Sequence, residues 1–121
     1  MKATAAALKT YLSGFDLPAY NAESIPETTD PPYITYPMNL PEWSDKASLY
    51  IQIWDRSHSN TFILEKADEI LADIGEGKLI VAEGTTLVIW PETPAVQLIV
   101  DGDIRSAYIN LSINAYQMPG D

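Results

Sequence analysis

The sequence has no cysteine, a single histidine and no cluster of basic residues. Because cysteine is absent, disulfides, thiolate catalysis and cysteine-ligated metal sites are excluded. The lone histidine, His58, excludes a metal site built from several histidines. A glycine-rich loop of the kind that binds phosphate is also missing. We therefore predict that the protein is not an enzyme and has no catalytic residues, no cofactor and no bound metal.

Basic residues are few relative to acidic ones. The chain has 17 aspartates and glutamates against 7 lysines and arginines, which gives a formal net charge of −10. Nucleic-acid binding depends on lysine and arginine side chains placed against phosphates. Direct binding of DNA or RNA is therefore not expected, whereas an acidic surface suits a passage through which DNA slides without being held.

Long hydrophobic runs are absent, since no stretch reaches the roughly 20 apolar residues that cross a bilayer. Lys9 and Thr10 interrupt the apolar start of the chain, so we expect no signal peptide and no membrane partner. A protein made in the cytoplasm is the natural expectation. At 121 residues, 46% of them hydrophobic, the chain is long enough for a single domain, residues 1–121, with its own core.

The first third of the chain divides into a helical segment and a loop. An amphipathic pattern over residues 3–15 predicts a short helix. Residues 16–45 hold six of the nine prolines, and all of their charged residues are acidic. Because proline is disfavoured in helices and central strands, most of this region is predicted to be loop. Within it, the run Tyr33–Tyr36 lies between prolines and predicts an edge strand.

Residues 46–116 carry the clearest pattern and are predicted to form a core of strand, helix and further strands. Leu49, Ile51 and Ile53 alternate with polar and aromatic residues, which predicts a strand with one apolar face. A helix is then predicted from Thr61 to Ile74, after Ser57, Ser59 and Asn60 as possible N-caps and before Gly75. Its apolar stripe is Ile63, Ala67, Ile70, Leu71 and Ile74, and its opposite face carries Glu65, Asp68, Glu69 and Asp73.

The rest of the chain, from residue 78 onward, is predicted to form β strands. Hairpins are predicted around Glu83–Thr85 and around the Asp-Gly pair at 101–102, joining strands at 78–82, 86–90, 95–100 and 104–113. If the last strand ran unbroken to Tyr116 it would be about 40 Å long, so we expect it to bend at a bulge or to pair with another molecule. The expected class is α+β, an antiparallel sheet of about five or six strands with one long and one short helix packed on a face.

Asp55, Ser57, His58 and Ser59 are the residue types of a hydrolase, but they are neighbours in sequence. Catalytic triads are assembled from converging side chains, usually from distant segments, whereas neighbours at a strand-to-helix corner diverge. The serines are better explained as helix caps, and Asp55 as a partner of Arg56 or of a neighbouring subunit. Asp101 and Asp103 offer too few ligands for calcium.

Several segments resemble the tail terminator, or tail completion, proteins of long-tailed bacteriophages, which are often labelled minor capsid or head-tail joining proteins. The resemblance covers most of the chain after residue 30. It is carried by PYITYPM (Pro32 to Met38), LYIQIWDRSHSNTFILEKADEI (Leu49 to Ile70), the helix end at Ile74–Gly77, and VQLIVDGDIRSAYINLSI (Val96 to Ile113). The IWDRS corner followed by the ADEI helix is its most specific part.

The resemblance implies a structural virion-assembly protein found in the tail or neck of the virion. It implies a homo-oligomeric ring, typically a hexamer, that caps the tail tube protein and joins it to the head-tail connector proteins, while DNA passes without specific binding. Edge strands and exposed apolar faces are the expected contact surfaces. We predict contacts with subunits or partners at Tyr33, Ile34, Tyr36, Tyr50, Trp54, Asp55, Arg56, Trp90 and Tyr108, and a lumen-facing acidic surface at Glu65, Asp68, Glu69 and Asp73.

Three other functions are compatible with the sequence. A neck or head-tail connector adaptor has a similar size and fold class, and a tail tube subunit would polymerise into long tubes instead of stopping at a ring. Outside phages, the chain is compatible with a small monomeric domain that binds a ligand or peptide and is stabilised by it. A hydrolase is the least favoured of the alternatives.

Overall fold

The computed structural model describes residues 2–37 and 46–117, and the side chains of 2–37 and 46–116. Its elements, in chain order, are α1 (Lys2–Ser13), β1 (Ala19–Asn21), β2 (Tyr33–Tyr36), β3 (Lys46–Arg56), α2 (Thr61–Ile74), β4 (Lys78–Ala82), β5 (Thr85–Asp101) and β6 (Ile104–Gln117). The α+β class is confirmed. The predicted helix at 61–74 has the bounds of α2, and the short helix ends two residues earlier than predicted, at Ser13.

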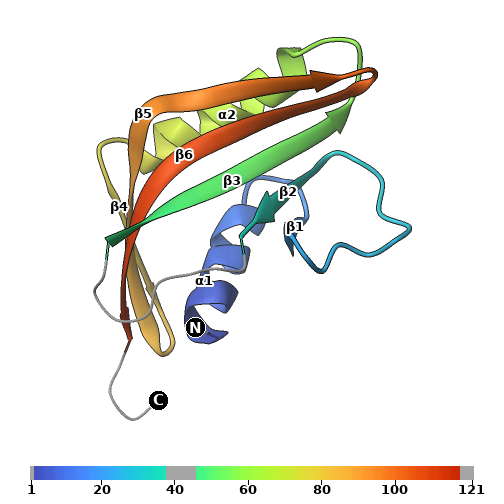
Figure 1. Cartoon of the computed structure of the whole chain (residues 1–121). Helices are drawn as coiled ribbons and strands as arrows, with labels where there is room; N and C mark the ends of the chain where they lie inside the picture. The colour runs from blue at the N-terminus through green and yellow to red at the C-terminus, as the bar shows by residue number, and fades with distance from the viewer. Residues whose placement is uncertain (1, 38–45, 118–121) are drawn as a thin grey trace.

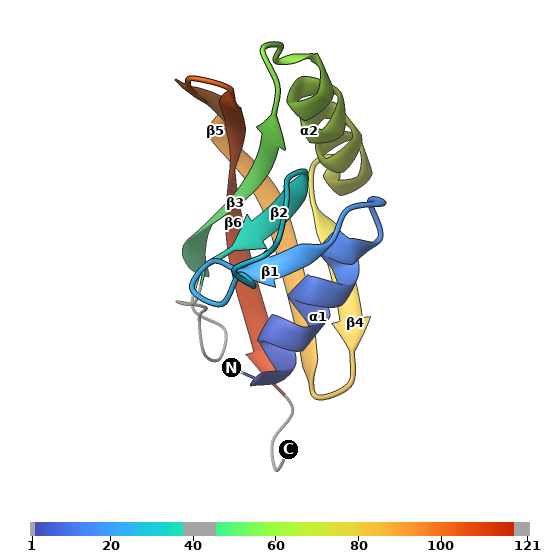
Figure 2. The same ribbon diagram turned by 90° about the vertical axis from the view of Figure 1, so that its right-hand side faces the viewer.

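The strands form one curved sheet in the order β1-β2-β3-β6-β5-β4 (Figure 1). Every neighbouring pair is antiparallel except β1 and β2, which are parallel, so the sheet is mixed at this one edge. Both helices lie on the same side of the sheet, as Figure 2 shows. We call this the helix side, and the opposite face, which no described helix covers, the outer face.

The core lies between the helix side of the sheet and the two helices. The alternating pattern of β3 is confirmed, because Leu49, Ile51 and Ile53 are all fully buried. They meet the buried stripe of α2, and α1 closes the rest of the same face with Leu8 and Leu12. The buried residues of α2 are Ile63, Ala67, Ile70 and Ile74, and those of β6 include Ala107, Ile109, Leu111 and Ile113.

The prediction of an edge strand at Tyr33–Tyr36 is wrong. β2 has partners on both sides, because β1 pairs with it in parallel and β3 in antiparallel register. As a result Ile34 is fully buried and Tyr36 is 5% exposed, so neither is available for a neighbouring subunit in this structure. The missing element was β1, whose three residues in a proline-rich loop are too short to give a periodic signal.

Two strands were predicted at 86–90 and 95–100, but the structure has a single strand there, β5 (Thr85–Asp101). Its register against β6 shifts between Pro91 and Val96, so the prolines fall where the ladder is interrupted. β6 runs unbroken to Gln117, and its far end pairs with Thr85 of the same chain. Its length therefore serves pairing within the chain and not with a second molecule. The other predicted outcome, a bend at an irregularity of the ladder, is confirmed, because β6 curves in Figure 1 and the register shift of β5 lies opposite its residues Ile109 and Leu111.

The ends of α2 follow the predicted chemistry only in part. Ser59 caps the first turn, since its Oγ accepts a hydrogen bond of 3.2 Å from the Thr61 amide, whereas Asn60 makes no side-chain cap. Gly75 ends the helix with φ of 59°, a conformation that side chains rarely adopt.

Candidate interaction surface

The outer face of the sheet carries most of the aromatic residues predicted to make contacts. Register places Tyr33, Trp54, Tyr50 and Tyr108 on it, because directly opposed residues of antiparallel strands share a face. Trp90 is on the same face, opposite Ser112. Alternation predicted this face for Tyr50, Trp54, Trp90 and Tyr108, which the register confirms. The contacts of the five side chains differ from one to the next.

Trp54 is held within its own chain. Its indole Nε1 donates a hydrogen bond of 3.1 Å to Thr35 Oγ1, and its ring lies 6.3 Å from that of Tyr33. Tyr33 in turn meets Tyr20 edge-on at 5.9 Å. These contacts fasten β1 and β2 to β3, so Trp54 and Tyr33 have a structural role on this face whatever else binds there.

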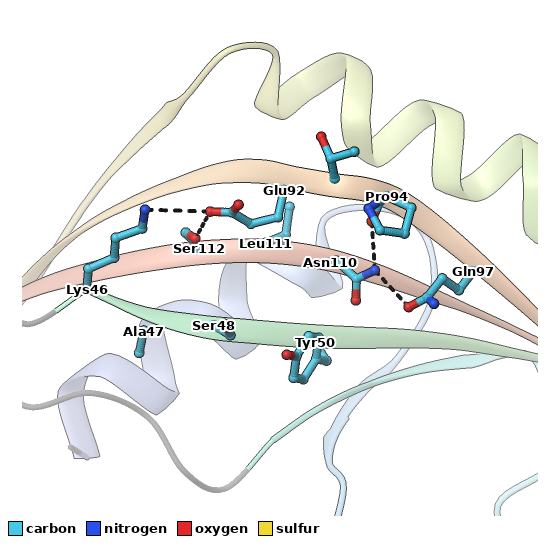
Figure 3. Close-up of a pocket in the computed structure, with 11 residues that line it drawn as sticks. Lys46, Ala47, Ser48, Tyr50, Glu92, Pro94, Gln97, Asn110, Leu111 and Ser112 are labelled. Carbon is cyan, nitrogen blue, oxygen red and sulfur yellow. Dashed lines mark hydrogen bonds and ion pairs between the residues drawn. The ribbon is translucent and has the colours of Figure 1, made fainter.

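Tyr50 is the most exposed of the aromatic residues predicted to make contacts, with 53% of its surface exposed. It stands beside a hollow of about 540 Å³ in the outer face, shown in Figure 3. Three strands contribute to the lining, because the hollow forms where β5 shifts register beside β6 and β3. The lining includes Lys46, Ser48, Tyr50, Glu92, Pro94, Gln97, Asn110 and Ser112.

Polar groups in this hollow are bonded mainly to one another. The Asn110 amide donates hydrogen bonds of 2.7 Å to the Pro94 carbonyl and 2.9 Å to Gln97 Oε1. Ser112 Oγ donates to the Glu92 carboxylate, which also lies 3.8 Å from Lys46 Nζ. The network holds the register shift of β5 against β6, and it leaves a polar, open depression.

The described residues that line the hollow offer hydrogen-bonding groups and one carboxylate paired with a lysine. Ser112 meets a carboxylate directly, without the imidazole that activates serine nucleophiles. His58 is far along the chain from this lining, since it follows the far end of β3 while the hollow uses Lys46 to Tyr50 at its start. No arrangement of nucleophile, base and orienting group is formed by these residues.

The corner after β3 is tied to the turn between β5 and β6. Arg56 pairs with the Asp103 carboxylate at 3.1 Å, and the Ser57 amide donates to the Asp103 carbonyl at 2.7 Å. Arg105 Nε donates to the Ser57 carbonyl at 3.0 Å. The expected pairing of Asp55 with Arg56 is therefore not seen, because Asp103 takes Arg56, and the turn aspartate serves to fasten this corner.

The acidic face of α2 is partly neutralised. Glu69 pairs with Lys66 at 3.0 Å, and Asp73 lies 3.5 Å from Lys78 Nζ. Asp73 also accepts a hydrogen bond of 2.5 Å from the Tyr11 hydroxyl. Burial, together with this hydrogen bond and the negative charge of Asp73, raises the pKa of Tyr11 well above its usual range. Asp73 thus helps to hold α1, α2 and β4 together, whereas Glu69 is paired within α2.

Glu65 and Asp68, the other two predicted lumen residues, lie on the exposed side of α2. Within residues 2–37 and 46–117, no group of three or more acidic, histidine or cysteine side chains is placed to hold a metal ion.

Two apolar strand edges that the sequence did not indicate are exposed. Leu98, Ile99 and Val100 in β5 are 43%, 44% and 54% exposed, and Leu79 and Val81 in β4 are 61% and 73% exposed. A continuous apolar run before a tight turn is also typical of a buried strand, so periodicity alone did not mark these residues. Only the pairing of the strands shows that they lie at open edges.

No protein-family model matches the sequence, and no curated protein matches it. Among the helices in the described part of the chain, none combines the length and the apolar character needed to span a membrane.

Proposed function

We propose that this protein is a structural virion-assembly protein of the tail terminator type, which forms a ring at the end of the tail tube and presents a docking surface to the head-tail connector. The proposal begins from the sequence segments that resemble this family. The observation that carries it is the exposed apolar surface on β4 and β5, with side chains up to 73% exposed. Exposed apolar side chains along strand edges are typical of sites that bind other proteins.

The charge of the chain supports the same function. A net charge of −10 disfavours binding to nucleic acid and suits a ring through which DNA moves. Glu65 and Asp68 of α2 are the exposed carboxylates best placed for such a lumen, because Glu69 and Asp73 are already paired with lysines.

The test is the mass of the assembled particle. Multi-angle light scattering of the purified chain, alone and with its tail tube protein, combined with negative-stain images, should show closed rings. Long tubes of this chain alone would instead identify a tail tube subunit. Binding to connector proteins without any ring of this chain would identify a neck adaptor.

The hollow beside Tyr50 favours one alternative from another class, a monomeric domain that binds a small polar ligand or a peptide. Its volume of about 540 Å³ falls within the range of ligand sites, although its polar groups are largely satisfied within the chain. Thermal shift screening against polar metabolites and short peptides tests it. A ligand that stabilises wild type but not Tyr50→Ala, in a chain that stays monomeric with tube protein, would replace the assembly function.

A further inference from the structure

Residues 96–101, which we call the open stretch of β5, form an unpaired sheet edge. β4 pairs with β5 only between Thr85 and Ile89, so the open stretch bonds to β6 on one side and has no partner on the other among the described strands. Leu98 and Val100 point to the helix side and Ile99 to the outer face, and all three are about half exposed. The edge is therefore apolar on both faces, and such edges pair readily with another strand.

The backbone groups that face this edge follow from the turn at its end. Asp101 and Ile104 close a two-residue turn, so their backbone groups bond to each other. Because hydrogen bonds alternate along an antiparallel pair, the N–H and C=O groups of Leu98 and Val100 point away from β6 and toward the open edge. A second strand laid along β5 in antiparallel direction can therefore bond to both residues.

A second copy of the chain can present the same edge to the first. A two-fold rotation about an axis perpendicular to the sheet sets one β5 beside the other with opposed directions, and it keeps both helix sides on the same side of the joined sheet. β4 begins opposite Ile89, so the edge is open from there to the turn, and the turn of the second copy has room beside β5. Figure 1 shows this turn at the right end of the sheet, away from β4 at the left.

The sequence of the open stretch matches itself in one register. With Ile99 opposite Ile99 of the second copy, Leu98 lies opposite Val100, and Gln97 lies opposite Asp101. Apolar side chains then meet apolar side chains at the centre, and polar side chains meet each other at both ends. A register centred on Leu98 would instead set Gln97 against Ile99.

Charge favours this contact over other contacts between two copies. The net charge of −10 makes two copies repel each other over most of their surface, whereas residues 93–100 carry no charged side chain. Asp101 is the one charged residue of the open stretch, and its carboxylate meets an amide of the second copy. Gln97 accepts a hydrogen bond from Asn110 through Oε1, which leaves its Nε2 to donate to that carboxylate.

We propose that two copies of the chain join through the open stretch of β5, about a two-fold axis perpendicular to the sheet, with Ile99 of one copy opposite Ile99 of the other. The two six-stranded sheets then continue as one. Such an isologous contact closes with two copies and does not extend round a ring. The inference therefore goes beyond the proposed function, whose ring needs a different contact between neighbours.

A single cysteine tests the contact, because the natural chain has none. Ile99 and its copy form an opposed pair without mutual hydrogen bonds, whose Cα atoms are about 4.5 Å apart, within the range that a disulfide spans. Under mild oxidation, Ile99→Cys should give a covalent dimer on non-reducing denaturing gels, and nothing larger. Leu79→Cys is the matched control, because Leu79 lies at the β4 edge and is more exposed than Ile99, so random collisions would cross-link it at least as fast.

Two further cysteine variants test the register. Chains that carry Gln97→Cys, mixed with chains that carry Asp101→Cys, should form mixed disulfide dimers, whereas either variant alone should stay largely monomeric. Equal cross-linking of Ile99→Cys and Leu79→Cys would overturn the contact. Dimers of Gln97→Cys alone, as strong as those of the mixture, would overturn the register.

Charge changes test the same contact without disulfide chemistry. Gln97→Glu keeps an acceptor for Asn110 but sets a carboxylate opposite each Asp101, so it should weaken the dimer about 2- to 30-fold in sedimentation equilibrium at low salt. Ile99→Lys sets two like charges against each other at the axis and should leave only monomers at concentrations where wild type dimerises. Leu79→Lys should dimerise as wild type does, and the melting temperature of each monomer reports folding separately.

Failure of this contact and failure of the proposed function give different results. A wild-type chain that stays monomeric at every concentration without tube protein, or a folded Ile99→Lys that still dimerises, would overturn the contact. Rings formed by such chains with tube protein would leave the ring function standing. Wild-type dimers that never form rings with tube protein would support the contact and overturn the ring.

Discussion

The burial of α2 predicts a large difference between two leucine-sized side chains of the same helix. Ile70 is fully buried against the sheet, whereas Leu64 is 40% exposed. Isoleucine to alanine removes three carbon atoms, and about 0.8 kcal/mol for each buried carbon gives about 2.4 kcal/mol of lost transfer free energy. The cavity left behind brings the loss of unfolding free energy to about 3–4 kcal/mol for Ile70→Ala.

For Leu64→Ala the expected loss is below about 1 kcal/mol, because the side chain is already partly in water. Urea unfolding followed by circular dichroism measures both variants, with protein kept dilute enough to be monomeric. A shift of the midpoint at constant slope shows that stability alone has changed. Equal losses for the two variants, or a loss below about 1 kcal/mol for Ile70→Ala, would refute the packing of α2 on the sheet.

Three further predictions follow from particular contacts. Tyr11→Phe should lower the unfolding free energy by about 0.5–1.5 kcal/mol, the usual net value of one hydrogen bond, and chemical denaturation of the dilute monomer at pH 7 measures it. Because the pKa of Tyr11 is raised in the folded state, its contribution is complete below pH 10 and is lost as pH rises further. Wild type should therefore lose more stability than Tyr11→Phe between pH 10 and 12, and parallel curves would contradict the Tyr11–Asp73 contact. Gly75→Ala should cost about 1–3 kcal/mol because φ is 59° there, while Gly77→Ala, whose added Cβ meets only a carbonyl 3.9 Å away, should be nearly neutral in the same denaturation assay. The purified chain should show no binding to duplex DNA by fluorescence anisotropy at 150 mM salt, and saturable binding would contradict the charge argument.

Periodic segments were predicted well because a single physical factor governs them. The alternation of Leu49, Ile51 and Ile53 and the stripe of α2 each follow from burying one face against one core. Glycine at the end of α2 was predictable for a similarly local reason, since few other residues adopt its conformation. These features required no knowledge of distant contacts.

Features that depend on pairing between distant segments were not predictable. β1 has no periodicity of its own and exists because β2 provides a partner, and this partner converts Ile34 from an edge residue into a core residue. Asp55 was expected to pair with Arg56 or with a neighbouring subunit, but the folded chain brings Asp103, in the turn before the adjacent strand β6, to Arg56. The same limit hid the open edges of β4 and β5, because exposure of an apolar strand depends on which strands lie beside it.

The hydrogen bonds around Asn110 show why the hollow in the outer face could not be predicted from the sequence. The partners of Asn110 come from the register shift in β5, a change of one strand relative to another that leaves no mark in composition. The outer-face aromatic residues could be placed on the correct side by alternation, but whether each was packed, as Trp54 is, or open, as Tyr50 is, depended on side chains from other strands.

The mass of the particle in solution tests the central proposal most directly. Light scattering across a range of concentrations and salt, with the tail tube protein present and absent, should yield a closed ring. Six copies of the 13.4 kDa chain would give about 80 kDa. A mass that remains at 13.4 kDa under every condition, tube protein included, would contradict the proposal that this protein acts by forming a ring.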